Sequence, residues 1–75
     1  MIELAEIRRA AGCTQVELAA AMNTSQGQIS RIERQSDFLL STLRAYLTAL
    51  GAEASLVVSV DGKTLAQELT EGRKR

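Results

Sequence analysis

The chain has 75 residues, with nine basic and nine acidic side chains, one cysteine, and no histidine or proline. This length suits one small domain, near the size at which a single core is only just sufficient. The composition excludes zinc and haem ligand sets and His-dependent nucleophiles, and no run approaches the about 18 apolar residues of a membrane span, so we expect no metal, cofactor, catalytic residue or membrane association.

The chain opens with the signals of two short helices. Apolar residues at helical spacing predict the first helix over residues 2–11, and Gly12 follows it as a stop. The letters "TQVE" predict a capping box, in which the Thr14 side chain caps the second helix and Glu17 bonds back to the backbone. We expect this helix to run to about Met22.

A third helix follows almost at once. Asn23 suits a left-handed turn, and "SQGQ" predicts a second capping box, with Ser25 as the cap and Gln28 as its partner. The helix is expected to continue to about Arg34 and contains Gly27, although glycine costs a helix interior about 1 kcal/mol relative to alanine. Because Gly27 would lie at the second helical position, under the cap, we expect its cost to be smaller.

The fourth predicted helix closes the helical part of the chain. Ser41 or Thr42 is expected to cap it, and it should run through Leu50 and end at Gly51. The preceding residues, 35–40, are interpreted as a loop. We expect apolar residues of the second, third and fourth helices to form the core, namely Leu18, Ile29, Ile32, Leu43 and Leu47.

After the helices the apolar period changes from 3.6 to 2. This alternation predicts a half-buried strand over residues 54–60, and Asp61-Gly62 is a strong two-residue hairpin signal. Residues 63–70 have two interpretations, a short returning strand or a helical turn opened by "TLAQ". The polar basic end is interpreted as a frayed tail.

The second and third helices, joined by the short turn "NTS", form the helix-turn-helix arrangement of DNA-binding proteins. A small residue, Ala19, stands where the two helices would cross. The third helix offers Gln26, Gln28 and Arg31 to base edges, since glutamine bonds adenine in two places and arginine bonds guanine likewise. The role of Gln28 stays open between cap and contact.

The segment "TQVELAAAMNTSQGQISRIE" resembles the Cro/repressor (XRE) class of helix-turn-helix proteins, over about residues 7–50. The run "SDFLLSTLRAYLTALGAEASLVVSVDG" is similar to one subgroup, the antitoxins of the HigA and HipB kind. The resemblance implies a mainly α fold, a small lambda-repressor-like bundle with a C-terminal β-strand or hairpin used for dimerisation. It also implies a longer segment before the first helix in many members, whereas Met1 here begins almost inside that helix.

The resemblance assigns residues to DNA. It implies that Gln15 and Ser25 contact the phosphate backbone and that Gln26, Gly27 and Arg31 fall on base-reading positions, although Gly27 departs from the side chain that is usual there. We combine these residues with others that the helix surface is expected to offer. The expected base contacts are then Gln26, Gly27, Gln28 and Arg31, and the expected phosphate contacts are Gln15, Ser25, Ser30, Arg34 and Arg9.

Two arginines follow one another at the end of the first helix. The resemblance implies that Arg8 forms an internal ion pair with Glu33, between the first and third helices, and we expect this structural role rather than a phosphate contact. Arg9 is then the free charge.

The C-terminal strand predicts a partner. The apolar face of the strand is expected to cover the helices, and its unpaired edge is expected to pair with the same strand of a second subunit. Such a homodimer would place two recognition helices about 34 Å apart, which suits a palindromic operator. Tyr46 is interpreted as packing or as part of this interface, and the expected dimer contacts are Leu56, Val57, Val58, Val60 and Tyr46.

These expectations divide the chain into a helix-turn-helix DNA-binding domain (1–51), a dimerisation strand or hairpin (52–66) and a flexible basic tail (67–75). We expect a cytoplasmic, sequence-specific repressor. By resemblance it is the antitoxin of a type II toxin-antitoxin operon, which represses that operon and neutralises a toxin, in HigA-type systems a ribosome-dependent mRNA endonuclease. The alternatives are a free-standing phage-type or housekeeping repressor and, favoured by the neutral net charge and Gly27, a protein-interaction module that has lost DNA binding.

Overall fold

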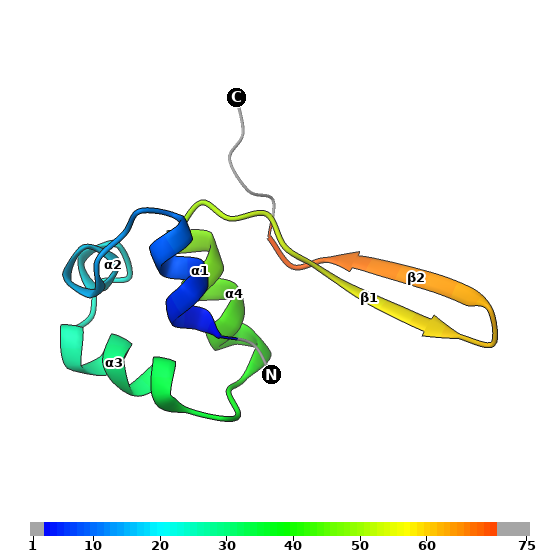
Figure 1. Cartoon of the computed structure of the whole chain (residues 1–75), viewed down its shortest axis with the longest axis horizontal. Helices are drawn as coiled ribbons and strands as arrows, with labels where there is room; N and C mark the ends of the chain where they lie inside the picture. The colour runs from blue at the N-terminus through cyan, green and yellow to red at the C-terminus, as the bar shows by residue number, and fades with distance from the viewer. Residues whose placement is uncertain (1–2, 71–75) are drawn as a thin grey trace.

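The structure, a computed structural model, describes residues 3–70 as four helices and one antiparallel hairpin. The helices are α1 (Leu4–Ala10), α2 (Gln15–Ala21), α3 (Gln26–Arg34) and α4 (Leu40–Ala49), and the strands are β1 (Ser55–Val60) and β2 (Lys63–Glu68). The helices gather into one cluster, whereas the hairpin extends away from it (Figure 1). The expected fold class, a small mainly α helix-turn-helix bundle with a C-terminal hairpin, is confirmed.

The capping boxes predicted from the sequence are complete at α2 and only half formed at α3. At α2 the capping box is confirmed, because Glu17 N donates to Thr14 Oγ1 (3.0 Å) and Thr14 N donates to Glu17 Oε1 (2.9 Å). At α3, Gln28 N donates to Ser25 Oγ (3.1 Å), but among the described residues the Gln28 side chain makes no bond back to the cap. At α3 the predicted Ser25 cap is therefore correct, and the predicted return bond from the Gln28 side chain is wrong.

The start of α4 also differs from the prediction. The helix begins at Leu40, and Leu39 stands in the cap position with no side-chain hydrogen bond, so neither Ser41 nor Thr42 is the cap. A side-chain cap is worth about 1 kcal/mol, whereas burying one large apolar side chain is worth about 1.5–3 kcal/mol. Since α4 buries three large side chains, Leu43, Tyr46 and Leu47, packing decides where this helix begins.

The core lies inside the helix cluster. Every expected core residue is buried there, and Ala19 is buried where α2 and α3 lie in contact. Glycines end α1 and α4 as predicted, since Gly12 and Gly51 both have a φ of 72°. The buried apolar residues are Leu4, Leu18, Ala19, Ile29, Ile32, Leu43, Tyr46 and Leu47.

The hairpin has the predicted turn. Asp61 (φ 51°) and Gly62 (φ 76°) both adopt positive φ, as a two-residue type I′ turn requires. Strand β2 returns through the register Val58↔Leu65 and Val60↔Lys63, so the strand interpretation of this segment is correct and the helical turn is wrong.

The expectation that the strand covers the helices is wrong. Every residue of β1 and β2 is exposed, including Leu56, Val58 and Val60 on one face and Val57 on the other. The hairpin points away from the helix cluster (Figure 1), so its faces have no core within the chain to pack against.

The base of the hairpin is tied to the end of the helical part. Thr70 is buried, its Oγ1 donates to Ala52 O (2.6 Å), and Ala54 N donates to Thr70 Oγ1 (3.1 Å). Leu69 N also donates to Ala54 O (2.9 Å). The expected boundary at residues 66 and 67 therefore falls inside β2, and residues 67–70 are not a flexible tail. The rest of that tail, 71–75, and the start of the predicted first helix lie outside the described residues.

Candidate nucleic-acid interface

Helices α2 and α3 form a compact helix-turn-helix. The turn between them is held by Asn23, which adopts a φ of 58°, and by backbone bonds from Asn23 N to Ala20 O (3.2 Å) and Thr24 N to Ala19 O (2.9 Å). Helix α3 buries Ile29 and Ile32. Its opposite side is therefore turned outward, and no apolar side chain is exposed on this helix.

The four expected base contacts are all exposed on α3. Gln26, Gly27 and Gln28 occupy its first turn, and Arg31 lies one turn further along. The structure thus groups them on one helix.

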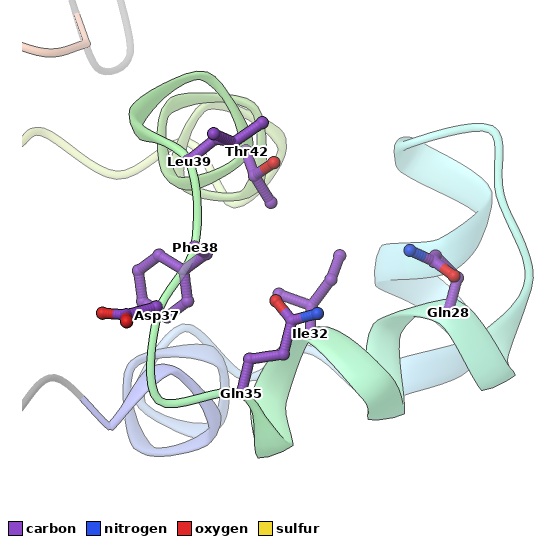
Figure 2. Close-up of a pocket in the computed structure, with 7 residues that line it drawn as sticks. All are labelled: Gln28, Ile32, Gln35, Asp37, Phe38, Leu39 and Thr42. Carbon is purple, nitrogen blue, oxygen red and sulfur yellow. The ribbon is translucent and has the colours of Figure 1, made fainter.

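The side chain of Gln28 is exposed and makes no hydrogen bond to its own cap among the described residues. It borders a groove between α3 and the segment that leads into α4, together with Ile32, Phe38 and Thr42 (Figure 2). The other residues along this groove are Gln35, Asp37 and Leu39. Capping of α3 therefore leaves the Gln28 side chain free for another contact.

Gly27 is not required by the packing of α3. A Cβ atom built on it would meet only Ser25 Oγ, at 3.9 Å, which is ordinary van der Waals contact. The glycine therefore removes a side chain from the outer surface of the helix without any internal steric reason.

The expected phosphate contacts lie in three places. Ser30 and Arg34 lie on α3 and are bonded to each other, since Arg34 Nη1 donates to Ser30 Oγ (2.5 Å). Arg9 is exposed at the end of α1 and lines the same shallow hollow as Gln15 and Gln26. The remaining one, Ser25, caps α3.

Beneath this surface lies a buried ion pair. Arg8 Nε and Nη2 donate to Glu33 Oε2 (2.7 Å) and Oε1 (3.2 Å), and the two side chains are only 9% and 6% exposed. Arg8 Nη1 also donates to Cys13 O (3.0 Å), so this pair joins α1 and α3 to the start of α2. Arg8 is consequently committed to the interior, as the ion-pair expectation requires.

Tyr46 belongs to this buried cluster and not to a dimer interface. It is 0% exposed, and its hydroxyl donates to Glu33 Oε2 (2.5 Å) and lies 3.2 Å from Leu4 O. The expectation that it contributes to dimer contacts is wrong, because no surface of this side chain is available to a second subunit. A buried tyrosine hydroxyl needs a hydrogen-bond partner, and the Glu33 carboxylate supplies it.

The electrostatics of the cluster keep Glu33 ionised. Burial acts to raise the pKa of Glu33, but the hydrogen bonds from Arg8, Tyr46 and Gln15 outweigh it and leave that pKa below its ordinary value. The hydrogen bond to Glu33 raises the pKa of Arg8. Burial and the neighbouring carboxylate raise the pKa of Tyr46, which stays neutral.

This pairing also explains how a neutral chain presents a basic helix. Arg8 neutralises Glu33 inside the fold, so the exposed charges of α3 are Arg31 and Arg34. The distribution of charge, rather than its zero sum, decides the field at this surface.

One connection between α2 and α3 was missed at the level of sequence. Gln15 Nε2 donates to Glu33 Oε1 (2.9 Å), and Gln26 Nε2 donates to Gln15 Oε1 (3.2 Å). Each glutamine directly follows a cap, in "TQ" and in "SQ", and this shared position was the available signal.

Within residues 3–70, no group of three potential metal ligands comes together, and no helix is long and apolar enough to cross a bilayer.

Comparison with known proteins gives a consistent result. The helix-turn-helix family model HTH_3 matches residues 4–56. Two Mycobacterium tuberculosis proteins named as antitoxins, HigA3 and HigA2, are 41% identical over 70 residues and 36% identical over 63 residues. These matches cover 89% and 81% of this chain but 62% of each relative, so the chain spans less than two thirds of their length.

Solved structures show the same similarity. The DNA-bound antitoxin HigA3 is 37% identical with a TM-score of 0.77, and the match covers 100% of this chain and 97% of that one. A HigA antitoxin described for DNA bending induced by unique dimerisation is 37% identical with a TM-score of 0.78, over 88% of this chain and 92% of that one.

Proposed function

Because this chain belongs to the helix-turn-helix family, we propose that it is a sequence-specific DNA-binding repressor and the antitoxin of a type II toxin-antitoxin pair. It acts as a homodimer on the palindromic operator of its own operon, in the cytoplasm, without a cofactor. Its relatives are named as antitoxins, and one of them is solved bound to DNA. We therefore expect a regulator rather than an enzyme, in agreement with the composition of this chain.

The observation that carries the proposal is the outer surface of α3. Its inner side is anchored by Ile29 and Ile32, and its outer side offers Gln26 and Arg31 with no competing acidic side chain exposed on the same helix. Glutamine and arginine are the side chains that read adenine and guanine in the major groove. We assign base contacts to Gln26, Gly27, Gln28 and Arg31, with Gly27 contributing close backbone approach.

The phosphate contacts are proposed for Gln15, Ser25, Ser30, Arg34 and Arg9. Arg9 and Arg34 are the charged members, so a dimer would neutralise about four phosphates. At about 0.9 counterions released per phosphate, a fourfold rise in salt should weaken binding by about a hundredfold.

The dimer is proposed to form through the hairpin. One face carries Leu56, Val58 and Val60 of β1 and Leu65 of β2, all exposed in the single chain. A second copy would cover this face. Val57 projects from the opposite face, and we assign it to the interface only through pairing of the free edge of β1 with the second copy. Exposed apolar patches of this kind mark protein interfaces.

The partner protein is proposed to be the toxin of the same operon, since the relatives of this chain are named as antitoxins. If the product of the adjacent gene co-purifies with this chain, the antitoxin assignment is supported. A chain that binds DNA but captures no such product would instead be a free-standing repressor.

The test of DNA binding is titration of the full chain with duplexes from the region upstream of its own gene, at two salt concentrations. We expect a specific duplex to bind with the salt dependence given above. Failure of every such duplex to bind at low salt would contradict the assignment as a repressor. The remaining alternative would be a protein-interaction module, which the net charge of zero favours.

The base-reading assignment has its own comparison of two arginines. Arg31→Ala should lower discrimination between operator and mutated duplexes, whereas Arg9→Ala should weaken all duplexes alike. Equal and sequence-independent losses for the two variants would contradict the assignment.

A further inference from the structure

Two neighbouring leucines at the start of α4 are exposed to solvent in the single chain. Leu39 is 72% exposed and Leu40 is 52% exposed. Among the described residues, the other large apolar side chains that are exposed are Val16 on α2 and those of the hairpin. We call Leu39 and Leu40 the leucine patch, since the described helices expose two adjacent large apolar side chains only here.

The position of Leu39 is unfavourable for α4 itself. It stands at the N-cap and makes no side-chain hydrogen bond to the helix, although Ser41 and Thr42 follow closely. Leucine is among the least favoured residues at an N-cap. The packing of α4 onto the core gives no reason for this residue, because its side chain stays exposed. A local rule that is broken without a gain inside the chain indicates a role outside it.

The leucine patch is continuous with the core. Leu39 borders the groove between α3 and the segment that leads into α4, where it lies beside Phe38 and Ile32 (Figure 2). Ile32 belongs to the core, and Phe38 packs against it. An apolar group placed on the patch would therefore extend the core of the helices rather than form an isolated surface contact.

The hairpin carries an apolar face that no part of its own chain covers. This face is formed by Leu56, Val58, Val60 and Leu65. The base of the hairpin is fixed by two hydrogen bonds of Thr70 Oγ1, which hold the strands in a direction away from the helix cluster (Figure 1). A hairpin held in this direction reaches a leucine patch only in a second copy of the chain.

One face of the hairpin is too small to hold two chains together by itself. The register places six residues on the apolar face, and two of them, Lys63 and Gln67, are polar. A stable interface engages about 20–30 residues of each partner. Each subunit must therefore bury further surface, and the leucine patch supplies it. In a two-fold dimer every contact occurs twice, so both hairpins and both patches would be covered.

We propose that the hairpin of each subunit packs across the leucine patch of the other subunit. The hairpin thus covers in the second chain the helices that it does not cover in its own. This inference rests on the proposed homodimer and names the surface that the hairpin contacts. The patch ends the segment that joins α3 to α4, so the contact links the hairpin of one subunit to the DNA-binding helix of the other.

The first measurement is the dimer dissociation constant of the full chain without DNA, by sedimentation. Leu39→Asp/Leu40→Asp should raise this constant by about a hundredfold, because the hairpin of the second copy would then have to bury two carboxylates. The variant should keep its helical circular dichroism, since aspartate is favoured at an N-cap and in the first turn of a helix. Loss of the dimer then cannot be attributed to loss of α4.

Val16→Asp is the matched control. Val16 is 61% exposed in the first turn of α2, so the change again places an acidic side chain at an exposed apolar position near a helix start. It should leave the dimer dissociation constant within about twofold of the wild-type value. Equal weakening by Val16→Asp and by the patch variant would be a general effect of charge and would overturn the inference.

Cross-linking identifies what covers the patch. Leu40 is replaced by the photoreactive residue p-benzoylphenylalanine, and chains with and without an isotopic label are mixed and irradiated. We expect cross-links between a labelled and an unlabelled chain that fall within residues 55–68. Cross-links to residues 39–40 of the second chain would show a contact between two patches and would overturn the inference. Cross-links that form only with the product of the adjacent gene would overturn it as well.

The hairpin variant Val58→Asp separates this inference from the proposed function. If Val58→Asp dissociates the dimer and Leu39→Asp/Leu40→Asp does not, the hairpin dimer stands and the inference is overturned. If neither variant dissociates the dimer, the proposed hairpin interface is overturned too. A wild-type chain that stays monomeric at every concentration overturns both.

Discussion

The helical part of the chain, residues 4–50, and the hairpin, residues 55–68, differ in the burial of their apolar side chains. In the helices Leu18, Ile29 and Tyr46 are 0% exposed, whereas in the hairpin Leu56, Val58 and Val60 are each at least 45% exposed. The helices complete their core within one chain. The hairpin has the composition of a core element but nothing in its own chain to cover it, so the difference points to a partner at the hairpin and to DNA at the helices.

Polar groups differ in the same way. The helices enclose a satisfied cluster around Glu33, in which Arg8, Gln15 and Tyr46 all donate to one carboxylate. The hairpin's one side-chain hydrogen bond within the described residues is the exposed pair Ser59 and Thr64. We therefore expect changes in the helices to act on stability and changes in the hairpin to act on association.

The largest effect is expected from Arg8→Met. It leaves the Glu33 carboxylate buried without its ion-pair partner, which should lower the free energy of unfolding by about 3–5 kcal/mol. Urea unfolding followed by circular dichroism measures the loss. Arg9→Met, next to it but exposed, is the control and should change stability by no more than about 0.5 kcal/mol. Similar losses for both variants would mean that the ion pair does not hold the helices together.

The next effect concerns the hairpin. Val58→Asp places a charge on the proposed dimer face and should raise the dimer dissociation constant by about a hundredfold, because each subunit must then bury a carboxylate. Sedimentation should show the 8.1 kDa monomer while circular dichroism keeps its helical signal. Ser59→Asp, on the opposite face, should leave the dimer intact. A dimer unaffected by Val58→Asp would place the interface elsewhere.

Two glycines give a smaller and opposite pair of effects. Gly62→Ala should destabilise the hairpin turn by about 1 kcal/mol, because Gly62 adopts a φ of 76°. Gly27→Ala should stabilise α3 by about 0.5 kcal/mol or less, since its added methyl group meets only Ser25 Oγ at 3.9 Å. Thermal unfolding of both variants provides the measurement, and a destabilised Gly27→Ala would indicate a constraint on α3 that its packing does not explain.

The smallest expected effect is a dependence on pH that belongs to the helices. The pKa of Glu33 is lower in the folded chain than in the unfolded chain, so Glu33 adds stability above the ordinary glutamate value of about 4.3. That stability is lost as the pH falls through the lower, folded value. Urea unfolding between about pH 6 and pH 3 should show the loss, and the Arg8→Met/Glu33→Gln double variant should lack this component. An identical slope in the double variant would assign it to other carboxylates.

Local signals predicted much of the molecule. The Thr14 capping box, the left-handed Asn23 and the Asp61-Gly62 turn are all as expected, because each depends on a few neighbouring residues. The start of α4 was misplaced since packing, and not a cap, sets it. The packing interpretation of Tyr46 is correct and the interface interpretation is wrong. The sequence left both open because a tyrosine at helical spacing has the same local pattern in a core and at an interface.

The sequence by itself determined the helices, the turn chemistry and which residues of α3 are exposed, because periodicity and capping act over a few positions along the chain. Only the tertiary structure decided where the hairpin points and what surrounds Glu33. Both depend on residues far apart in sequence, such as Thr70 against Ala52 and Gln15 against Glu33. The hydrogen bonds around Glu33, and with them the orientation of the Gln15 amide, follow from such distant neighbours and from no local pattern.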